Sequence, residues 1–272
     1  MTVCIAAICE SGKKIVVAAD RMLTFPSPTN LEFETAEQKI VGLAPSCIAL
    51  ASGNTAYATQ ILDNTRQKLG GNQSPPIGQV LEIVRTEYIS TRMVKTDETV
   101  TASLGADYAR FLQKGGTLPN YLQVQPAVFQ QLFMITQQFN LGVDIIVAGI
   151  DDLGAHISVV TNPGTLFSLD KLGYSAIGTG GMHATIHLLL SGHTSGRTFL
   201  ETLYDVYVAK KASEVAPGVG QATDLAVIES GNVWHCTELV VKKLQGTFEE
   251  SSKKQSPKLD ELKKVYDEQH KS

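Results

Sequence analysis

The sequence predicts an α+β fold in four layers, with two antiparallel sheets packed face to face between outer helices (αββα). Apolar runs of strand length come in pairs joined by short turns, which is typical of antiparallel hairpins. Paired helical segments separate these groups of strands. Sheets and helices that each have one apolar face bury those faces against one another, and the layered arrangement follows.

The first half of the chain is expected to form two hairpins and two helices. The turns Glu-Ser-Gly-Lys and Ala-Pro-Ser join the paired strands, Gly70-Gly71 stop the first helix, and Pro75-Pro76 start the second. Glycines and Pro119 interrupt residues 95–120, which we expect to be a peripheral insertion. The expected strands are 2–9, 15–20, 39–43 and 47–52, and the helices are 55–69 and a segment beginning at 77.

The second half repeats this order. The almost wholly apolar run 143–149 indicates a strand buried on both faces. Further strands are expected at 156–161, 165–169, 174–177, 224–229 and 233–240, and helices at 129–139, 183–190 and 198–211. The sequence thus predicts one domain over residues 1–246, followed by a charged, partly helical tail over 247–272.

Composition excludes several classes of partner. The formal net charge of -4 and the pI near 5.9 give no reason to expect nucleic acid or an anionic membrane. The four cysteines are widely spaced, and three lie in apolar runs, which suits a reducing cytoplasm. We expect no leader peptide, because no charged and then apolar segment opens the chain, and no apolar run reaches membrane-spanning length.

Thr2 is the most informative residue. A small second residue favours removal of the initiator Met1, and Thr2 would then carry a hydroxyl nucleophile and a free amine. An amine with a pKa of about 7.7–8.0 is a suitable base at neutral pH. Many chains begin Met-Thr without catalytic consequence, so the residues further along the chain must indicate whether Thr2 is catalytic.

Those residues resemble a known family. The chain reads TVCIA at its start, AADR at 18–21, KIV at 39–41, ALASGN at 49–54, VAGIDDLGAH at 147–156, IGTGG at 177–181 and TDLAVI at 223–228. The motifs fall in the order seen in proteasome β-type subunits, and the chain resembles the N-terminal-nucleophile (Ntn) hydrolases, especially the short bacterial proteasome-like peptidases. The resemblance covers roughly residues 2–240, without the insertion.

The resemblance implies a role for particular residues. It matches Thr2 to the nucleophile, Lys39 to the cation beside the hydroxyl, and Asp20 to the carboxylate that holds this lysine. Gly53 matches the residue whose backbone N–H faces the developing oxyanion, where one donor is worth about 10²–10³ in rate. Ser52, Arg21 and Gly181 are assigned to the same oxyanion or substrate-binding region. No cofactor or metal is implied.

Two positions depart from the family pattern. The family commonly has a serine where this chain has Gly181, which leaves Thr179 as the hydroxyl if the loop turns toward Thr2. The family's second acid aligns with Ala216, and Glu214 or Asp224 are the alternative carboxylates.

Other patterns are weaker. The Gly178–Gly181 segment between a strand and a helix is a possible phosphate cradle, but it lacks full GxGxxG spacing, and we favour a tight turn. His183 and His187 lie four residues apart near His193, but no HExxH glutamate accompanies them, and we predict no metal site.

The sequence therefore predicts a threonine peptidase that cleaves amide bonds of peptides or unfolded proteins through an acyl-enzyme on Thr2. Transfer of the acyl group to an amine is a close variant. The alternatives are a catalytically silent proteasome-like assembly subunit and a small-molecule amidase on the same fold. The resemblance also implies a homo-oligomer, either a ring or a helical stack.

Overall fold

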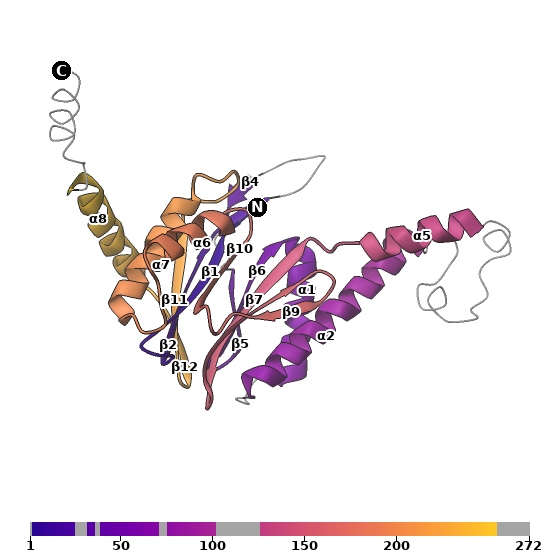
Figure 1. Ribbon diagram of the computed structural model, residues 1–272, viewed down its shortest axis with the longest axis horizontal. Helices are drawn as coiled ribbons and strands as arrows, with labels where there is room; N and C mark the ends of the chain where they lie inside the picture. The colour runs from indigo at the N-terminus through magenta and orange to yellow at the C-terminus, as the bar shows by residue number, and fades with distance from the viewer. Residues whose placement is uncertain (1, 25–31, 36–38, 71–74, 102–125, 255–272) are drawn as a thin grey trace, which may run out of the picture. The chain divides into compact units, whose positions relative to one another are not determined.

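The computed structural model describes residues 2–24, 32–35, 39–70, 75–101 and 126–254 (Figure 1). The chain divides into two compact units, Met1–His235 and Cys236–Ser272. The division comes earlier than the predicted domain end at 246. In the described ranges every strand pair is antiparallel, which confirms the mixed α+β class with antiparallel sheets.

Two five-stranded sheets form the centre of the first unit. The β1 sheet has the order β10-β1-β2-β11-β12, and the β6 sheet has the order β5-β6-β7-β8-β9. A short hairpin of β3 (Met22–Thr24) and β4 (Glu32–Glu34) accompanies them. The strands of the β1 sheet are Cys4–Cys9 (β1), Lys14–Asp20 (β2), Tyr174–Ile177 (β10), Thr223–Glu229 (β11) and Asn232–His235 (β12). Those of the β6 sheet are Ile40–Ala44 (β5), Cys47–Gly53 (β6), Val143–Asp151 (β7), Gly154–Thr161 (β8) and Thr165–Ser168 (β9).

The two sheets pack face to face through alternate residues of their strands. Ala6 and Val17 of the β1 sheet share one buried cluster with Ile48, Leu50 and Ile146 of the β6 sheet. Alternate residues of a strand point to the same face, so the remaining apolar residues face outward to the helices. This inter-sheet core fixes the register of the strands that end at the candidate site.

Helices α1 (Thr55–Leu69) and α2 (Ile77–Thr96) cover the outer face of the β6 sheet (Figure 1). Asn54 caps α1 by accepting a hydrogen bond from the N–H of Tyr57 at 3.3 Å. The N-cap residue of α2 is Pro76, which makes no side-chain cap. Asp151 at the end of β7 caps α2 instead, because its Oδ2 accepts the Ile77 N–H at 2.9 Å.

Helices α6 (Gly181–Leu190) and α7 (Phe199–Ser213) cover the outer face of the β1 sheet on the other side of the unit (Figure 1). Thr198 and Glu201 form a capping box at the start of α7. Beyond α2 the chain continues as a π-helix, η1 (Asp97–Thr101), and α5 (Pro126–Gln138) precedes β7. Residues 102–120 of the predicted insertion lie outside the described residues.

The structure differs from the sequence prediction at two places. The segment after Arg21, for which no strand was predicted, begins with strand β3, and the predicted strand 233–240 ends at His235. Glu238–Lys254 form helix α8 of the second unit, because apolar residues there recur at helical spacing. Across the described ranges, each helix is too short or too polar to cross a bilayer.

Candidate active site

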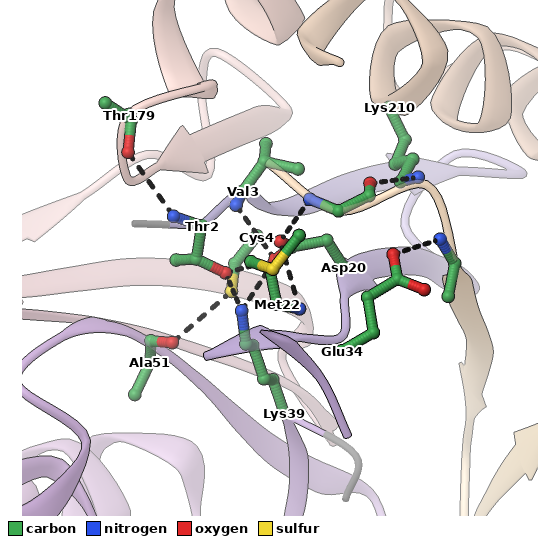
Figure 2. Close-up of polar contacts among 12 residues, drawn as sticks. Thr2, Val3, Cys4, Asp20, Met22, Glu34, Lys39, Ala51, Thr179 and Lys210 are labelled. Carbon is green, nitrogen blue, oxygen red and sulfur yellow. Dashed lines mark hydrogen bonds and ion pairs between the residues drawn. The ribbon is translucent and has the colours of Figure 1, made fainter. Parts of the chain in front are cut away.

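Thr2, Asp20 and Lys39 meet at one point, at the ends of β1 and β2 and just before β5 (Figure 2). The Lys39 ammonium donates to the Thr2 hydroxyl oxygen, and that hydroxyl donates to Asp20 Oδ1. Lys39 Nζ also pairs with Asp20 Oδ1 at 2.7 Å, and the two side chains are 13% and 0% exposed. A cation beside a hydroxyl stabilises the negative charge that develops when the oxygen attacks a carbonyl.

Backbone N–H groups hold the Asp20 carboxylate from several directions. Oδ1 accepts a hydrogen bond from Val3 at 3.1 Å, and Oδ2 accepts from Gly220 at 2.9 Å and from Met22 at 3.3 Å. These donors come from the residue before β1, from the loop before β11 and from β3. A buried carboxylate with this many donors remains in one position, and the position of the Lys39 ammonium is fixed with it.

The turn between β10 and α6 holds the backbone of Thr2. Thr179 Oγ1 accepts a hydrogen bond from the Thr2 nitrogen at 3.3 Å, and the Gly180 N–H donates to the Thr2 carbonyl at 3.2 Å. Gly178 has φ +87°, and a Cβ there would lie 2.3 Å from the Thr2 carbonyl oxygen. The segment is thus a tight turn around Thr2, and it places the Thr179 hydroxyl beside the Thr2 nitrogen.

A cavity of about 340 Å³ opens beside the Thr2 side chain. We call it the Thr2 cavity; it is lined by residues of β3, β5, β6 and α1 together with Thr2, Thr35 and Lys39. Ser52 and Gly53, at the end of β6, belong to this lining. Gly53 has φ +96°, and a Cβ there would lie 1.8 Å from the Gly142 carbonyl oxygen, so no other residue fits at this position.

Arg21 and Gly181 lie apart from this lining. Arg21 donates to Asp224 Oδ1 from Nε at 3.0 Å and from a terminal nitrogen at 2.6 Å, so the carboxylate forms an ion pair. Glu214 pairs with Lys210 at 2.5 Å and with Lys211 at 2.6 Å. Both carboxylates that the sequence offered as a second acid are thus engaged in ion pairs. Gly181 is the first residue of α6 and lines a neighbouring hollow.

Lys210 supports the site, and no pattern in the sequence had indicated this role. Its side chain is 0% exposed, and its ammonium donates to the carbonyl oxygens of Gly220 at 2.8 Å and Gln221 at 2.7 Å as well as to Glu214. Burial lowers the pKa of Lys210, and Glu214 opposes that effect. Since the N–H of Gly220 binds Asp20, Lys210 holds the loop that positions the Asp20 carboxylate.

Cys4 is the thiol nearest the site. Burial raises its pKa to about 12, although the positive charge of Lys39 acts in the opposite direction. Its Sγ contacts the Ala51 carbonyl oxygen at 3.5 Å (Figure 2). A thiol whose pKa is raised this far remains protonated at neutral pH and is a poor nucleophile.

Neither the models of known protein families nor the curated proteins match this chain. Within the described residues no three His, Cys, Asp or Glu side chains are grouped to hold a metal ion. His193 Nε2 donates a hydrogen bond to the Ile8 carbonyl oxygen at 3.0 Å, and its ring packs edge-on against Tyr174.

Proposed function

We propose that the protein is an N-terminal threonine hydrolase that cleaves amide bonds of peptides through an acyl-enzyme on Thr2. One observation carries the proposal: the Thr2 hydroxyl contacts a lysine ammonium and a buried carboxylate beside a cavity large enough for a side chain. A buried ion pair contributes little to the free energy of folding, because the cost of desolvating the two charges offsets much of their attraction. Its arrangement around a potential nucleophile favours a catalytic role.

The reaction has two steps. After loss of Met1, the Thr2 amine takes the hydroxyl proton while the hydroxyl oxygen bonds to the substrate carbonyl carbon. The amine then gives that proton to the leaving nitrogen, and the carbon–nitrogen bond breaks to leave an ester on Thr2. Water attacks the ester in the second step, and the acid product leaves as the hydroxyl is restored. Lys39 stabilises charge on the attacking oxygen throughout.

The arrangement of the fold also supports the proposal. Helices, two sheets and helices follow one another in the order expected of an Ntn hydrolase. Of the motifs that carry the resemblance, AADR and KIV contribute Asp20 and Lys39 beside Thr2, and IGTGG contributes the turn that holds it. Thr179 faces the Thr2 nitrogen, where it would orient the free amine.

Hydrolysis of fluorogenic peptides by the wild type and by two variants tests the proposal. We expect Thr2→Ala to reduce kcat/KM by at least about 10³-fold, because it removes the nucleophile, whereas Thr2→Ser retains a hydroxyl and part of the activity. Intact mass should show that the active chain begins at Thr2. Full activity in Thr2→Ala, or in a chain that retains Met1, would overturn the proposal.

A catalytically silent assembly subunit is the second candidate. It is favoured by one observation, which is that the nearby Glu214 and Asp224 are both committed to ion pairs and supply no second acid. Under this alternative Met1 is retained and Thr2→Ala changes neither peptide hydrolysis nor assembly. The same mass and activity measurements therefore separate the two functions.

A further inference from the structure

A second hollow, of about 460 Å³, lies between the two sheets next to the Thr2 cavity. We call it the Asp144 hollow. Its lining comes from β7 and β8 of the β6 sheet, from β10 of the β1 sheet, and from the turn and first residues of α6. Its described lining contains one ionisable side chain, that of Asp144.

The two spaces adjoin on both sheets. Ser52 lines the Thr2 cavity, and its direct partner across β6 and β7 is Asp144, which lines the second hollow. On the opposite sheet Gly178 lines the second hollow, and its Cα lies against Thr2, since a Cβ there would be 3.0 Å from Thr2 Cγ2. Directly paired strand residues lie about 5 Å apart. The linings of the two spaces therefore adjoin beside Thr2, and we treat the spaces as two parts of one cleft.

The Thr2 cavity and the Asp144 hollow differ in the charged side chains that line them. Lys39, Arg66 and Asp63 line the Thr2 cavity, whereas Asp144 gives the second hollow a negative charge alone among its described lining residues. The Thr161 hydroxyl donates to Asp144 Oδ1 at 2.5 Å and holds the side chain in place. In the described ranges no lysine or arginine pairs with Asp144. Its charge is available to a ligand.

The chemistry assigns each part of the cleft to one side of the cleaved bond. The Thr2 amine protonates the leaving nitrogen, so the leaving group must lie on the side of the Thr2 nitrogen. That nitrogen faces Thr179, whose turn lines the Asp144 hollow through Gly178 and Gly181. Lys39 and Gly53 lie on the other side, in the lining of the Thr2 cavity, which would take the acyl part.

We infer that the Asp144 hollow binds the residue following the cleaved bond and that Asp144 selects a lysine or arginine side chain there. This inference rests on the proposed function and adds a substrate class to it. The apolar side chains of Val159 and Ile186 in the lining suit the methylene stem of such a side chain, while Asp144 pairs with its charged end.

The test compares two quenched peptides that differ only after the cleaved bond, where one has lysine and the other glutamate. We expect the wild type to favour lysine about fivefold in kcat/KM, which is the range of a partly exposed ion pair. Asp144→Asn keeps an oxygen for Thr161 but removes the charge, so the ratio should fall to about one. Asp152→Asn removes an exposed carboxylate from the turn after β7 and should leave the ratio unchanged.

Salt provides a test that needs no variant, because added salt screens the ion pair and should lower the lysine-to-glutamate ratio of the wild type. Equal cleavage of the two peptides by the wild type, or a preference that persists in Asp144→Asn, would overturn this inference while Thr2-dependent cleavage still supported the proposed function. If neither peptide nor any fluorogenic substrate is cleaved in a Thr2-dependent manner, both proposals fail.

Discussion

Two clusters of ionisable side chains, at opposite ends of the strands, combine carboxylates with a cationic partner in different ways. Around Thr2, one oxygen of Asp20 contacts both the hydroxyl and the Lys39 ammonium. Around His156, the ring nitrogens face Asp170 at 2.8 Å and Asp151 at 3.1 Å.

The other contacts of the carboxylates distinguish the clusters. Asp151 also accepts N–H groups from Ile77 and Leu153, so it caps α2 and closes the turn after β7, and Asp170 accepts the N–H of Ile157. The His156 cluster therefore stabilises the backbone. Asp20 also binds backbone groups, but in addition it accepts a hydrogen bond from the Thr2 hydroxyl, which lies beside a cavity. A hydroxyl with a fixed cation, rather than a cluster of charges, is what indicates catalysis.

The largest predicted effect tests this contrast directly. Lys39→Met should reduce kcat by about 10²- to 10⁴-fold, because it removes the charge that stabilises the attacking oxygen. His156→Gln, which alters the other cluster, should leave kcat within about twofold. Steady-state hydrolysis of one fluorogenic peptide measures both. Comparable losses in the two variants would show that the clusters do not differ in this way.

Gly178→Ala should cause the next largest loss of activity. Its Cβ would lie 2.3 Å from the Thr2 carbonyl oxygen and would displace the nucleophile, and a displacement of about 1 Å costs about 10²-fold in rate. Gly192 also has a positive φ, of +67°, but a Cβ there meets nothing within 4 Å. Gly192→Ala therefore introduces similar backbone strain without moving Thr2. If both variants lose the same activity, the contact between Gly178 and Thr2 is unimportant.

The sequence predicted some of the secondary structure and some of the candidate site residues, but not all of them. Residues 55–69 were predictable because the helical period of their apolar residues reports which face is buried, and residues 143–149 because a short, almost wholly apolar run indicates a strand buried on both faces. Asp20 and Lys39 were proposed from motif order alone, and the structure brings them to Thr2. Whether Thr179 faces Thr2 could not be predicted, because the direction of the turn depends on glycine φ angles that the sequence does not determine by itself.

Other features could not be predicted from local pattern. Lys210 and Lys211 are adjacent in the sequence, and only the packing of α7 on the β1 sheet buries the first and not the second. Asp144 is the one polar residue in the apolar run 143–149, and its position in a hollow depends on residues that β8, β10 and α6 bring beside it from later in the chain. Ion pairs such as that between Arg21 and Asp224 join residues about two hundred positions apart and leave no signal in the local sequence.

Asp151→Ala should reduce stability without changing kcat. It removes the only side-chain cap that the described residues provide for α2, and such caps contribute about 1 kcal/mol to the free energy of unfolding. Urea unfolding of the variant and the wild type measures the difference. Asp152→Ala is the matched control, because its exposed side chain should contribute little. A large loss of peptidase activity in Asp151→Ala would contradict a purely structural role.

The smallest predicted effect is a pH dependence of stability. Burial lowers the pKa of His156, but hydrogen bonds and charges from Asp170 and Asp151 outweigh it, and the net pKa is raised. The folded chain therefore holds this proton more tightly than the unfolded chain does. The resulting stabilisation is complete below the ordinary histidine pKa of about 6.5 and is lost as pH rises through the raised value.

His156→Gln should accordingly cost more stability near pH 6 than at about pH 8.5. Urea unfolding of both chains at the two pH values provides the measurement, with His235→Gln, which alters an exposed histidine, as the control. A cost that is larger at the higher pH would reverse the sign and exclude a stabilising ion pair at His156.

Covalent labelling followed by mass mapping tests the central claim most directly. A threonine-directed electrophile should add its mass to the peptide that begins at Thr2, with Met1 absent, and the addition should disappear in Thr2→Ala. Labelling should also be slow in Lys39→Met, because the hydroxyl then lacks its neighbouring cation. Label on another residue, or equal labelling of Thr2→Ala, would contradict the assignment of Thr2 as the nucleophile.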